Sequence, residues 1–219
     1  GKSMTVLDFA AGTCWLSRFL NQLRCRTISC DVSETALRMG QELFSKFPPI
    51  GDKTYEPQFL KFDGHKIDLP SESVDRIICH DELHHIPNQE EVIAELARVL
   101  QTGGIAAFSE PGRFHSQSLE SQHDMKTFNV LENDIVLSEI FTAAQKYGFT
   151  DIKIKPICNT SISLQDYQQL TSNQRKTPPE KSVTKHIRLL FDYRLLFFLY
   201  QAAFISDTQS PIHLPHATF

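Results

Sequence analysis

The stretch TVLDFAAGTCW, residues 5–15, decides the fold. Its first five residues form an apolar run with one acidic residue, a pattern typical of a buried strand. The small residues from Ala10 to Gly12 predict a tight turn in which backbone N–H groups can approach a ligand. Apolar residues then recur at the spacing of one helix face, at Trp15, Leu16, Phe19, Leu20 and Leu23. A strand, a turn of small residues and a helix in this order predict the opening unit of an α/β sheet.

The same alternation continues along the chain. We expect further strands at residues 27–30, 58–62, 74–79, 105–108 and 152–155. A helix is predicted after the N-cap Ser33, a second after a capping box formed by Asn88 and Glu91, and a third over residues 134–147. Gly103-Gly104 is expected to end the second helix. This alternation predicts the α/β class, with a Rossmann-like, mostly parallel sheet and helices on both faces.

The composition is that of a folded domain without a broad basic surface. The 219 residues are 41% hydrophobic and 22% charged, near ordinary globular usage. Lys and Arg total 22 against 26 Asp and Glu, a net charge of −4, which argues against a nucleic-acid partner. Five cysteines without a close C-x-x-C pair do not form the pattern of a disulfide framework, so we expect reduced thiols and a cytoplasmic protein. Neither a signal segment nor a transmembrane span is indicated.

The C-terminal part differs in pattern from the rest. Residues 165–182 are polar without a hydrophobic period, and residues 183–205 are apolar nearly all round a helix axis. We therefore expect a single domain over residues 1–219, with a cofactor-binding core at 4–156 and a C-terminal lid and apolar helix at 157–219. Because the chain begins with Gly and enters its first strand almost at once, we also expect it to be part of a longer protein.

Acidic residues mark the ends of the first three predicted strands. In a parallel α/β sheet, ligands bind outside the carboxyl ends of the strands. Asp8 lies in the first strand, Asp31 follows the second, 23 residues beyond Asp8, and Asp63-Gly64 follows the third. A carboxylate at Asp31 is suited to accept hydrogen bonds from a ribose diol, and one at Asp63 is suited to an exocyclic amine.

These residues resemble the motifs of the class I S-adenosylmethionine-dependent methyltransferases, whose first motif reads Asp-x-Gly-x-Gly-x-Gly. The later stretch over residues 74–86 is similar to the same family, as is RVLQTGG at 98–104, where the family's usual wording ends in RVLKPGG. The resemblance covers residues 4–155. It implies a Rossmann-like fold and transfer of a methyl group from S-adenosylmethionine by in-line displacement, with S-adenosylhomocysteine as product.

For the first motif, the resemblance implies that Asp8 and the backbone of Ala10, Ala11 and Gly12 hold the methionine end of the cofactor. Ala10 and Cys14 stand where the family has Gly, so only Gly12 keeps the family's residue. These two departures motivate an alternative function, a degenerate and non-catalytic binding or scaffold domain that keeps the sheet but has lost turnover.

For the later strand ends, the resemblance implies contacts with the rest of the cofactor. Asp31 would accept hydrogen bonds from the ribose hydroxyls, and Val32 would cover one adenine face. Asp63, with Gly64 beside it, would accept the adenine amine. His80 would lie beside the methionine chain. Taken singly, such aspartates also form turns and caps, and it is their combination that favours a ligand.

A histidine pair follows the fourth predicted strand, where a proton would leave the acceptor. His84 or His85 is the candidate general base, because imidazole titrates near neutral pH; alternatively, one caps an element and the other packs. His80 and His84 have a spacing that would suit a metal on a helix, but at a strand-to-loop junction the spacing loses that meaning, and we expect no metal. Glu110 and His115 would face the acceptor side or form a turn.

The acceptor is expected to be a small molecule. The net charge is negative, and no Asn-Pro-Pro-Tyr motif of base methylases follows the fourth strand. A helix packed on the sheet is the simplest interpretation of residues 183–205, although a hydrophobic acceptor, a homodimer or contact with a missing flanking segment would also cover it. Trp15 stands where a nicotinamide-binding fingerprint needs Gly, which argues against a dehydrogenase. The methylated atom, oxygen, nitrogen or carbon, stays open.

Overall fold

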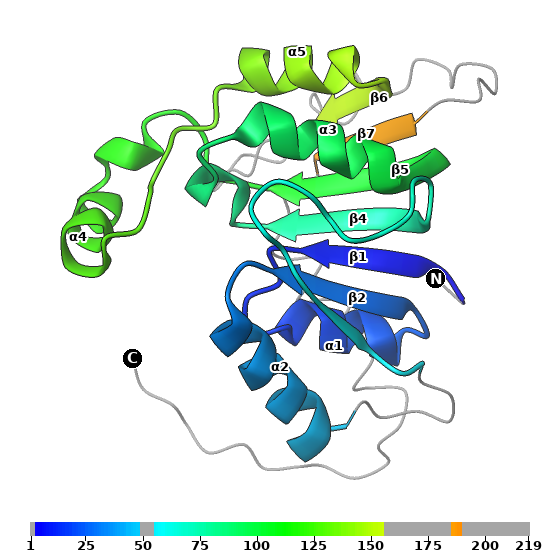
Figure 1. The fold of residues 1–219 in the computed structure, drawn as a ribbon. Helices are drawn as coiled ribbons and strands as arrows, with labels where there is room; N and C mark the ends of the chain where they lie inside the picture. The colour runs from blue at the N-terminus through cyan, green and yellow to red at the C-terminus, as the bar shows by residue number, and fades with distance from the viewer. Residues whose placement is uncertain (1–2, 49–54, 156–184, 190–219) are drawn as a thin grey trace, which may run out of the picture.

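The computed structural model describes residues 3–48, 55–155 and 185–189, which form one sheet flanked by helices (Figure 1). The sheet has seven strands in the order β3-β2-β1-β4-β5-β7-β6, and every neighbouring pair is parallel. The strands are β1 (Thr5–Phe9), β2 (Arg26–Asp31), β3 (Gln58–Lys61), β4 (Val74–His80), β5 (Leu100–Ser109), β6 (Phe149–Ile154) and β7 (Lys185–Leu189). The helices are α1 (Trp15–Gln22), α2 (Glu34–Lys46), α3 (Gln89–Val99), α4 (Leu119–Phe128) and α5 (Leu137–Lys146), with short 3-10 turns η1 (Leu83–His85) and η2 (His115–Gln117).

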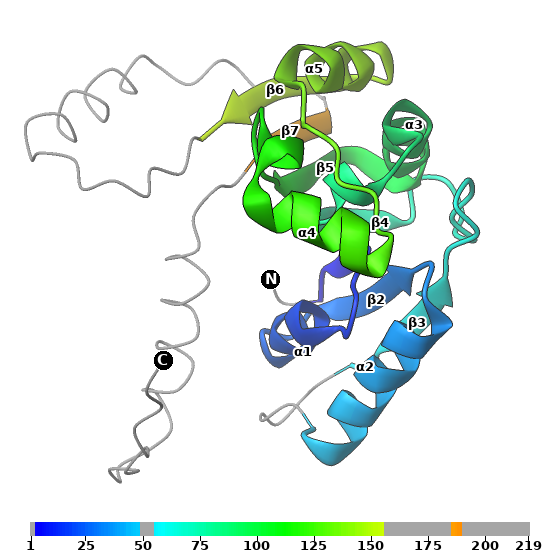
Figure 2. The same cartoon turned by 90° about the vertical axis from the view of Figure 1, so that its left-hand side faces the viewer.

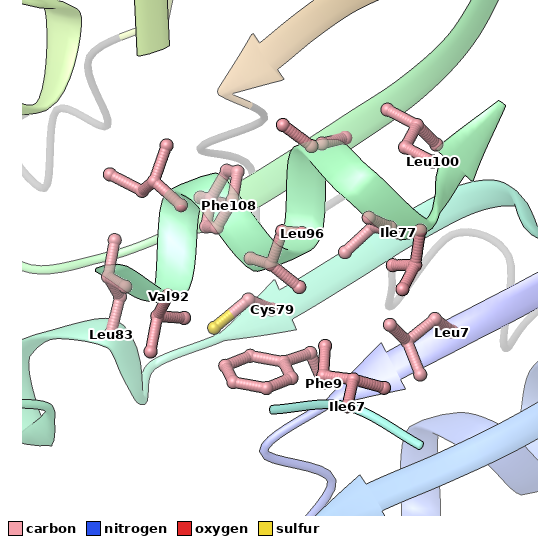
Figure 3. Packing of buried hydrophobic residues seen from close by; sticks show 14 of the residues in the cluster. Leu7, Phe9, Ile67, Ile77, Cys79, Leu83, Val92, Leu96, Leu100 and Phe108 are labelled. Carbon is pink, nitrogen blue, oxygen red and sulfur yellow. The ribbon is translucent and has the colours of Figure 1, made fainter. Parts of the chain in front are cut away.

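Strand β1 shows which helix covers which face, because alternate residues of a strand point to opposite faces. Leu7 and Phe9 lie in the main hydrophobic cluster together with Leu96 of α3 (Figure 3). Asp8, between them, points to the other face, where its carboxylate accepts a hydrogen bond from Ser17 of α1. Helices α1 and α3 therefore lie on opposite faces of the sheet (Figure 2), which confirms the predicted α/β class.

The starts predicted after Ser33 and Asn88 are correct, the helix predicted from residue 134 begins at Leu137, and one of the two predicted caps is not formed. The Ser33 hydroxyl accepts a hydrogen bond from Ala36 N at 3.2 Å and caps α2 as expected. Asn88 is the N-cap residue of α3, yet its side chain makes no cap bond. Its amide instead donates to Gly64 O and to the Glu91 carboxylate, at 3.0 and 2.6 Å. The predicted capping box was therefore wrong, because the Asn88 side chain is oriented by its contact with Gly64, which is far away in the sequence.

The end of α3 also differs from the sequence prediction. The helix ends at Val99, and β5 begins at Leu100, before Gly103-Gly104. Leu100 is fully buried and pairs with Val74 of β4, so packing in the sheet takes it out of the helix. The register then shifts before Ile105, and the two glycines lie in this irregular part of β5.

Strand β7 corrects the prediction for the C-terminal part. Residues 185–189, expected inside a helix over 183–205, form a parallel strand between β5 and β6. This strand, Lys-His-Ile-Arg-Leu, holds only two apolar residues, and its parallel pairing with β5 and β6 rather than its local spacing makes it a strand. This part of the predicted C-terminal lid and helix belongs to the sheet, and residues 156–184 and 190–219 lie outside the described residues.

The strand order reverses between β1 and β4, which lie side by side at the centre of the sheet. Such a switch point opens a crevice outside the carboxyl ends of the two strands, where α/β proteins bind ligands. The turn after β1 and the segment after β4 are therefore the two walls of the candidate site. Within the residues that the structure describes, none of the helices has the length and apolar character needed to cross a membrane.

Candidate functional site

The turn after β1 keeps the left-handed backbone of a glycine-rich loop although it holds only one glycine. Ala10, Gly12 and Cys14 have φ angles of 56°, 51° and 61°. This conformation costs a residue with a Cβ about 1–2 kcal/mol, which is the physical reason for glycine at such positions. The three positions are those at which the resembled motif has Gly, so the turn retains the motif's shape at some cost in stability.

The Cys14 side chain packs beneath this turn. Cys14 is fully buried in a small cluster with Ala11, Leu37 and Phe44. Its Sγ lies 3.6 Å from Gly12 O, and burial raises the pKa of the thiol to about 11. The thiol is therefore a neutral packing group under the loop, and the upper side of the turn is left to the backbone.

Asp31 joins the ends of β1 and β2. Its Oδ2 accepts a hydrogen bond from Gly12 N at 2.8 Å, and its Oδ1 accepts one from Ser33 N at 2.7 Å. The carboxylate thus holds the turn after β1 against the start of α2, and each oxygen keeps a second lone pair for a ligand. Val32, the next residue, is 60% exposed and offers an apolar surface beside it. Asp31 and Val32, the residues predicted to contact the ribose and the adenine, therefore lie side by side at the end of β2.

Asp8 is a buried carboxyl on the α1 face. It is 2% exposed, and the Ser17 hydroxyl donates to it at 2.7 Å while Ser29 donates to Ser17. Burial, opposed by the hydrogen bonds with Ser17 and helped by the charge of Asp31, raises the pKa of Asp8 to about 6. Asp8 therefore joins β1 to α1 through Ser17 and has little surface to offer a ligand, which argues against the predicted direct contact with the methionine end.

Asp63 and Gly64 follow β3, on the far side of β2 from the turn. Asp63 is exposed, and its Oδ1 accepts hydrogen bonds from His65 N and Lys66 N at 2.8 and 2.6 Å, which lower its pKa. Gly64 has φ +95°, a conformation that favours glycine. The carboxylate is fixed by its own turn, with Oδ2 directed away from those two bonds.

His80 ends β4 and meets α1 across the switch point. The rings of His80 and Trp15 lie edge to face, with centroids 5.5 Å apart. Trp15 is 40% exposed, so the pair forms a partly open aromatic wall between the turn after β1 and the segment after β4. Because Cys79 pairs with Phe9, His80 at the end of β4 lies next to the start of the turn at Ala10, and its contact with the methionine chain stays a prediction.

The segment after β4 is organised by one buried carboxylate, Glu110, which follows β5. Its Oε1 accepts hydrogen bonds from the backbone N–H of Glu82 and Leu83, and its Oε2 lies 2.9 Å from His84 Nδ1. Burial opposes a charge on His84, but the hydrogen bond and the charge of Glu110 outweigh it and raise the pKa of His84. Glu110 is thus a structural anchor for η1, and His84, which is 3% exposed, is not open to an acceptor.

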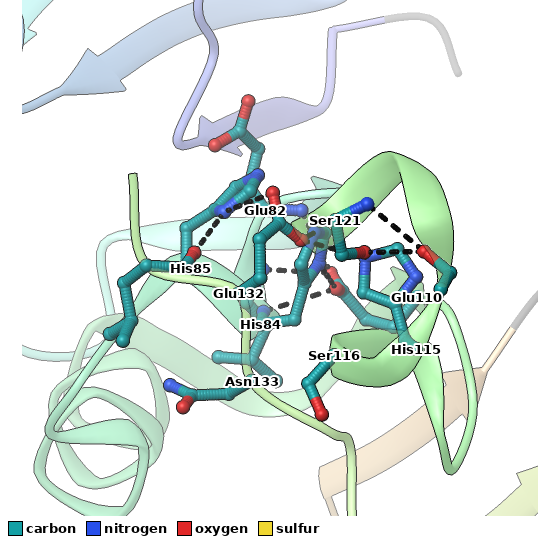
Figure 4. Close-up of polar contacts among 12 residues, drawn as sticks. Glu82, His84, His85, Glu110, His115, Ser116, Ser121, Glu132 and Asn133 are labelled. Carbon is teal, nitrogen blue, oxygen red and sulfur yellow. Dashed lines mark hydrogen bonds and ion pairs between the residues drawn. The ribbon is translucent and has the colours of Figure 1, made fainter. Parts of the chain in front are cut away.

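A second buried carboxylate, Glu132, gathers three histidines (Figure 4). Its oxygens lie 2.8 Å from His115 Nε2, 3.5 Å from His84 Nε2 and 3.6 Å from His85 Nδ1. His85 Nδ1 also donates to Leu131 O at 2.6 Å, and a third of the His85 side chain is exposed. Of the two predicted bases, His85 is the one that a small molecule can reach.

Sequence reasoning identified neither Glu132 nor the raised pKa of Glu82. Glu132 lies in the connection between α4 and α5, with no motif around it, and only the folded chain brings it to the histidines. Glu82 is partly buried; burial first, and then the charge of Asp31, raise its pKa to about 7. Figure 4 shows the Glu82 side chain on the edge of the histidine group. Both acids thus lie at the edge of the sheet where the predicted residues meet.

The residues present fit S-adenosylmethionine. A Cβ on Gly12 would have no atom within 4 Å, so the turn leaves space for a ligand above it. Asp31 supplies a carboxylate for hydroxyls, Val32 an exposed apolar surface for a ring, and the pair of Trp15 and His80 a wall beside a chain. The acidic groups at this edge also suit a cationic ligand.

Comparisons with known proteins agree with this architecture. Residues 7–108 match the family model described as "Methyltransferase domain". The ubiquinone/menaquinone biosynthesis C-methyltransferase UbiE of Escherichia coli is 26% identical over 136 residues, covering 59% of this chain and 51% of that protein. UbiE of Salmonella arizonae is 24% identical over 172 residues, covering 75% and 66%. The chain thus spans about half the length of the first of these relatives.

Solved structures give the same result for the fold. An S-adenosylmethionine-dependent methyltransferase from Mesorhizobium loti superposes with a TM-score of 0.62 at 16% identity, covering 78% of this chain and 86% of that one. The YcgJ protein of Bacillus subtilis superposes with a TM-score of 0.56 at 16% identity, covering 67% and 62%. The match over residues 7–108 and the shared fold show that this chain is similar to the class I S-adenosylmethionine-dependent methyltransferases, whose cofactor is S-adenosylmethionine.

Proposed function

We propose that this chain transfers the methyl group of S-adenosylmethionine to a small-molecule acceptor. The observation that carries the proposal is the carboxylate of Asp31, which accepts hydrogen bonds from Gly12 and Ser33 and so ties two strand ends into one binding surface at the switch point. The net charge of −4 supports a small acceptor over a nucleic acid.

The chain's own residues would bind and orient the two reactants. When bound, the cofactor supplies a methyl group on a positively charged sulfur, which an acceptor displaces in line. Asp31 would hold the ribose hydroxyls and Val32 one face of the adenine, with Asp63 at the adenine amine. The backbone of the turn from Ala10 to Gly12 would bind the methionine end. Rigid positioning of this kind supplies most of the rate in a displacement between two bound molecules.

The acceptor side is formed by the segment after β4. We assign the proton-accepting role to His85, because its ring is partly exposed and its Nδ1–H is fixed by Leu131 O, which leaves Nε2 on the other side of the ring. His84 would position this segment through Glu110. The aromatic pair of Trp15 and His80 would exclude water from the methyl group.

The relatives narrow the class of acceptor. The UbiE proteins are named as C-methyltransferases of ubiquinone and menaquinone biosynthesis, and at 26% and 24% identity they support a small-molecule acceptor with a carbon as the methylated atom. A hydrophobic acceptor is consistent with that class. A homodimer or a contact with a flanking segment is a further proposal, which sedimentation would test.

Calorimetry tests the proposal. S-adenosylmethionine and S-adenosylhomocysteine are titrated separately into the 219-residue chain. Binding of both at micromolar concentration is the expected result, because product and substrate share the groups that the strand ends would contact. A chain that binds neither molecule would instead be the non-catalytic scaffold that Ala10 and Cys14 first suggested. A screen of quinone-like and phenolic acceptors by mass spectrometry then tests transfer.

A further inference from the structure

We propose that His84, His115 and Glu132 form a binding site for one divalent transition-metal ion of the Zn²⁺ class. One donor atom from each residue lies within 4.8 Å of the other two. The Nε2 atoms of His84 and His115 are 3.5 and 2.8 Å from Glu132 Oε2. Tetrahedral Zn²⁺ with bonds of about 2.0–2.2 Å holds its ligand atoms roughly 3.2–3.6 Å apart. His84 Nε2 and Glu132 Oε2 already have this spacing, whereas His115 Nε2 and Glu132 Oε2 are hydrogen-bonded at 2.8 Å, so an ion would replace the proton between them and separate them slightly.

The orientation of His84 supports this site. Its Nδ1 lies 2.9 Å from Glu110 Oε2, and Glu110 is itself fixed by backbone N–H groups of Glu82 and Leu83. Metal-binding histidines usually donate their second ring N–H to a carboxylate, which fixes the tautomer and the ring. In this tautomer His84 Nε2 carries its lone pair on the side of Glu132 and His115, and Figure 4 shows the three side chains gathered there.

The distance across the cluster also suits an ion. A separation of 3.5 Å between His84 Nε2 and Glu132 Oε2 exceeds the length of an N–H···O hydrogen bond, about 2.7–3.2 Å. The two atoms therefore face each other at the spacing of two ligands of one metal. His115 closes the group from η2, with its ring nearly perpendicular to that of His84. The buried Ser121 places its Oγ 3.2 Å from the same His115 Nε2.

The charge of the cluster favours a bound cation. Glu110 and Glu132 are both 7% exposed. In the part of the chain that the structure describes, the ion pairs of these two carboxylates are all with histidines and none is with Lys or Arg. Buried carboxylates are costly without a counter-charge, and a divalent ion supplies one with the imidazoles left neutral.

The donor set indicates which ions are suitable. Two imidazoles and one carboxylate are typical of Zn²⁺ and neighbouring transition metals, whereas Mg²⁺ and Ca²⁺ prefer oxygen ligands. Three protein ligands leave a fourth position open, as in catalytic sites. About a quarter of the His115 side chain is exposed, which gives an ion access from that side. The spacing of His80 and His84 could not have revealed this site, because the donors come from three separate segments.

The fourth position suggests what the ion would do. It would bind an oxygen of the methyl acceptor, such as a phenol or a quinol hydroxyl, and lower the pKa of that oxygen. This role rests on the proposed methyl transfer, because the cluster lies after β4 and β5 on the acceptor side of the switch point. The proposal of the metal site itself depends only on the geometry of His84, His115 and Glu132 and not on methyl transfer.

A cobalt titration tests the site. The 219-residue chain is stripped with a chelator, titrated with Co²⁺ while visible absorption is recorded, and then titrated with Zn²⁺ in competition. We expect one Co²⁺ per chain, the visible bands of a tetrahedral site with nitrogen and oxygen ligands, and displacement by Zn²⁺. The variants His115→Gln and Glu132→Gln should each weaken binding by at least about 100-fold, and Glu110→Gln by about 10- to 100-fold.

The control is His123→Gln, which removes an exposed histidine of α4 and should leave binding unchanged. Far-ultraviolet circular dichroism checks that each variant is folded, and His115 is the safest position because it is the most exposed ligand. The proposal is overturned if the chain binds no stoichiometric ion, if folded His115→Gln binds as tightly as the parent, or if thiolate charge-transfer bands show a cysteine site. Binding of S-adenosylhomocysteine by the stripped chain would show that such a failure concerns the metal alone.

Discussion

The Sγ atom of Cys14 fills the space beside Gly40 that a side chain on α2 would otherwise take. A Cβ built on Gly40 would lie 2.3 Å from this sulfur and 2.7 Å from Cys14 Cβ. The missing side chain on α2 therefore compensates for the extra side chain in the turn after β1. A cysteine in a glycine position is tolerated here because its neighbour is a glycine.

This pairing predicts a compensating swap. Gly40→Ala should lower the free energy of unfolding by about 1–3 kcal/mol, because the new methyl group forces Cys14 and its turn to move. The double variant Cys14→Gly/Gly40→Ala should recover most of that loss, as measured by urea unfolding. Gly112→Ala is the matched control, since a Cβ there has no atom within 4 Å. The Cys14→Gly single variant completes the cycle, and a loss in the double variant equal to the sum of the two single losses would show that the two residues are not coupled.

Asp31→Ala should weaken binding of S-adenosylhomocysteine by about 1–3 kcal/mol, or roughly 5- to 150-fold, because the ribose hydroxyls lose their acceptor and the turn at Gly12 loses its support. Calorimetry measures this change directly. Asp75→Ala removes a carboxylate that accepts a backbone N–H at the opposite edge of the sheet, from Thr5, and should leave the affinity unchanged. If both variants bind as the parent does, Asp31 is a turn residue only.

Asp8 should make stability depend on pH in an unusual direction. The folded state raises the pKa of Asp8 from 3.8 to about 6, so between these values the folded chain keeps a proton that the unfolded chain has lost. Stability from this group is therefore full below about pH 4 and is lost as the pH rises through 6. The loss amounts to roughly 3 kcal/mol at pH 7.

The variant Asp8→Asn isolates this effect, because asparagine still accepts the hydrogen bond from Ser17 and does not ionise. It should unfold at the same urea concentration as the parent near pH 4 and at a higher one at pH 7. A difference between the two proteins that stays constant from pH 4 to pH 7 would contradict the assignment.

Trp15 should report ligand binding without a label. It is the chain's single tryptophan, it is 40% exposed, and it lies against His80 in the wall of the proposed site. A bound ligand would change its solvent contact, so addition of S-adenosylhomocysteine should shift or quench the emission with the same affinity that calorimetry gives. Trp15→Phe should abolish the signal while retaining binding. Unchanged emission at saturation would place the ligand elsewhere.

His85→Gln should lower kcat by about 10²- to 10⁴-fold on an acceptor that loses a proton, with the affinity for S-adenosylhomocysteine unchanged. The glutamine still donates toward Leu131 O, so the loop is expected to keep its place. The matched control is again His123→Gln, which should leave kcat unchanged. Full activity of folded His85→Gln would remove His85 from the mechanism.

Much of the sheet could be predicted from sequence because its signals are local. A buried parallel strand is an apolar run, and Ser33 caps its helix with its own side chain, so each is encoded within a few residues. Strand-end acids such as Asp31 could be found for the same reason, since the topology of parallel sheets gathers them without further information.

The errors came where distant residues compete for a local group. The Asn88 amide donates to Gly64 O, and the side chain does not cap α3. Leu100 pairs with Val74 in the sheet, so α3 ends before it. Residues 185–189 form a strand because an open position between β5 and β6 accepts them. Glu132 reaches the histidines only through the fold. These outcomes depend on contacts between segments far apart in the chain.

The position of β7 bears on how the protein is made. The strand enters the sheet between β5 and β6, yet 30 residues of chain separate Ile154 from Lys185. At translation rates of about 5–20 residues per second, β5 and β6 are synthesised a few seconds before the strand that belongs between them. During that interval β5 has an unpaired edge, open to premature pairing with β6 or with a neighbouring nascent chain. The interior strand β7 is therefore synthesised after both of its neighbours. A chain that ended after residue 155 would keep the unpaired edge of β5 and would be expected to aggregate.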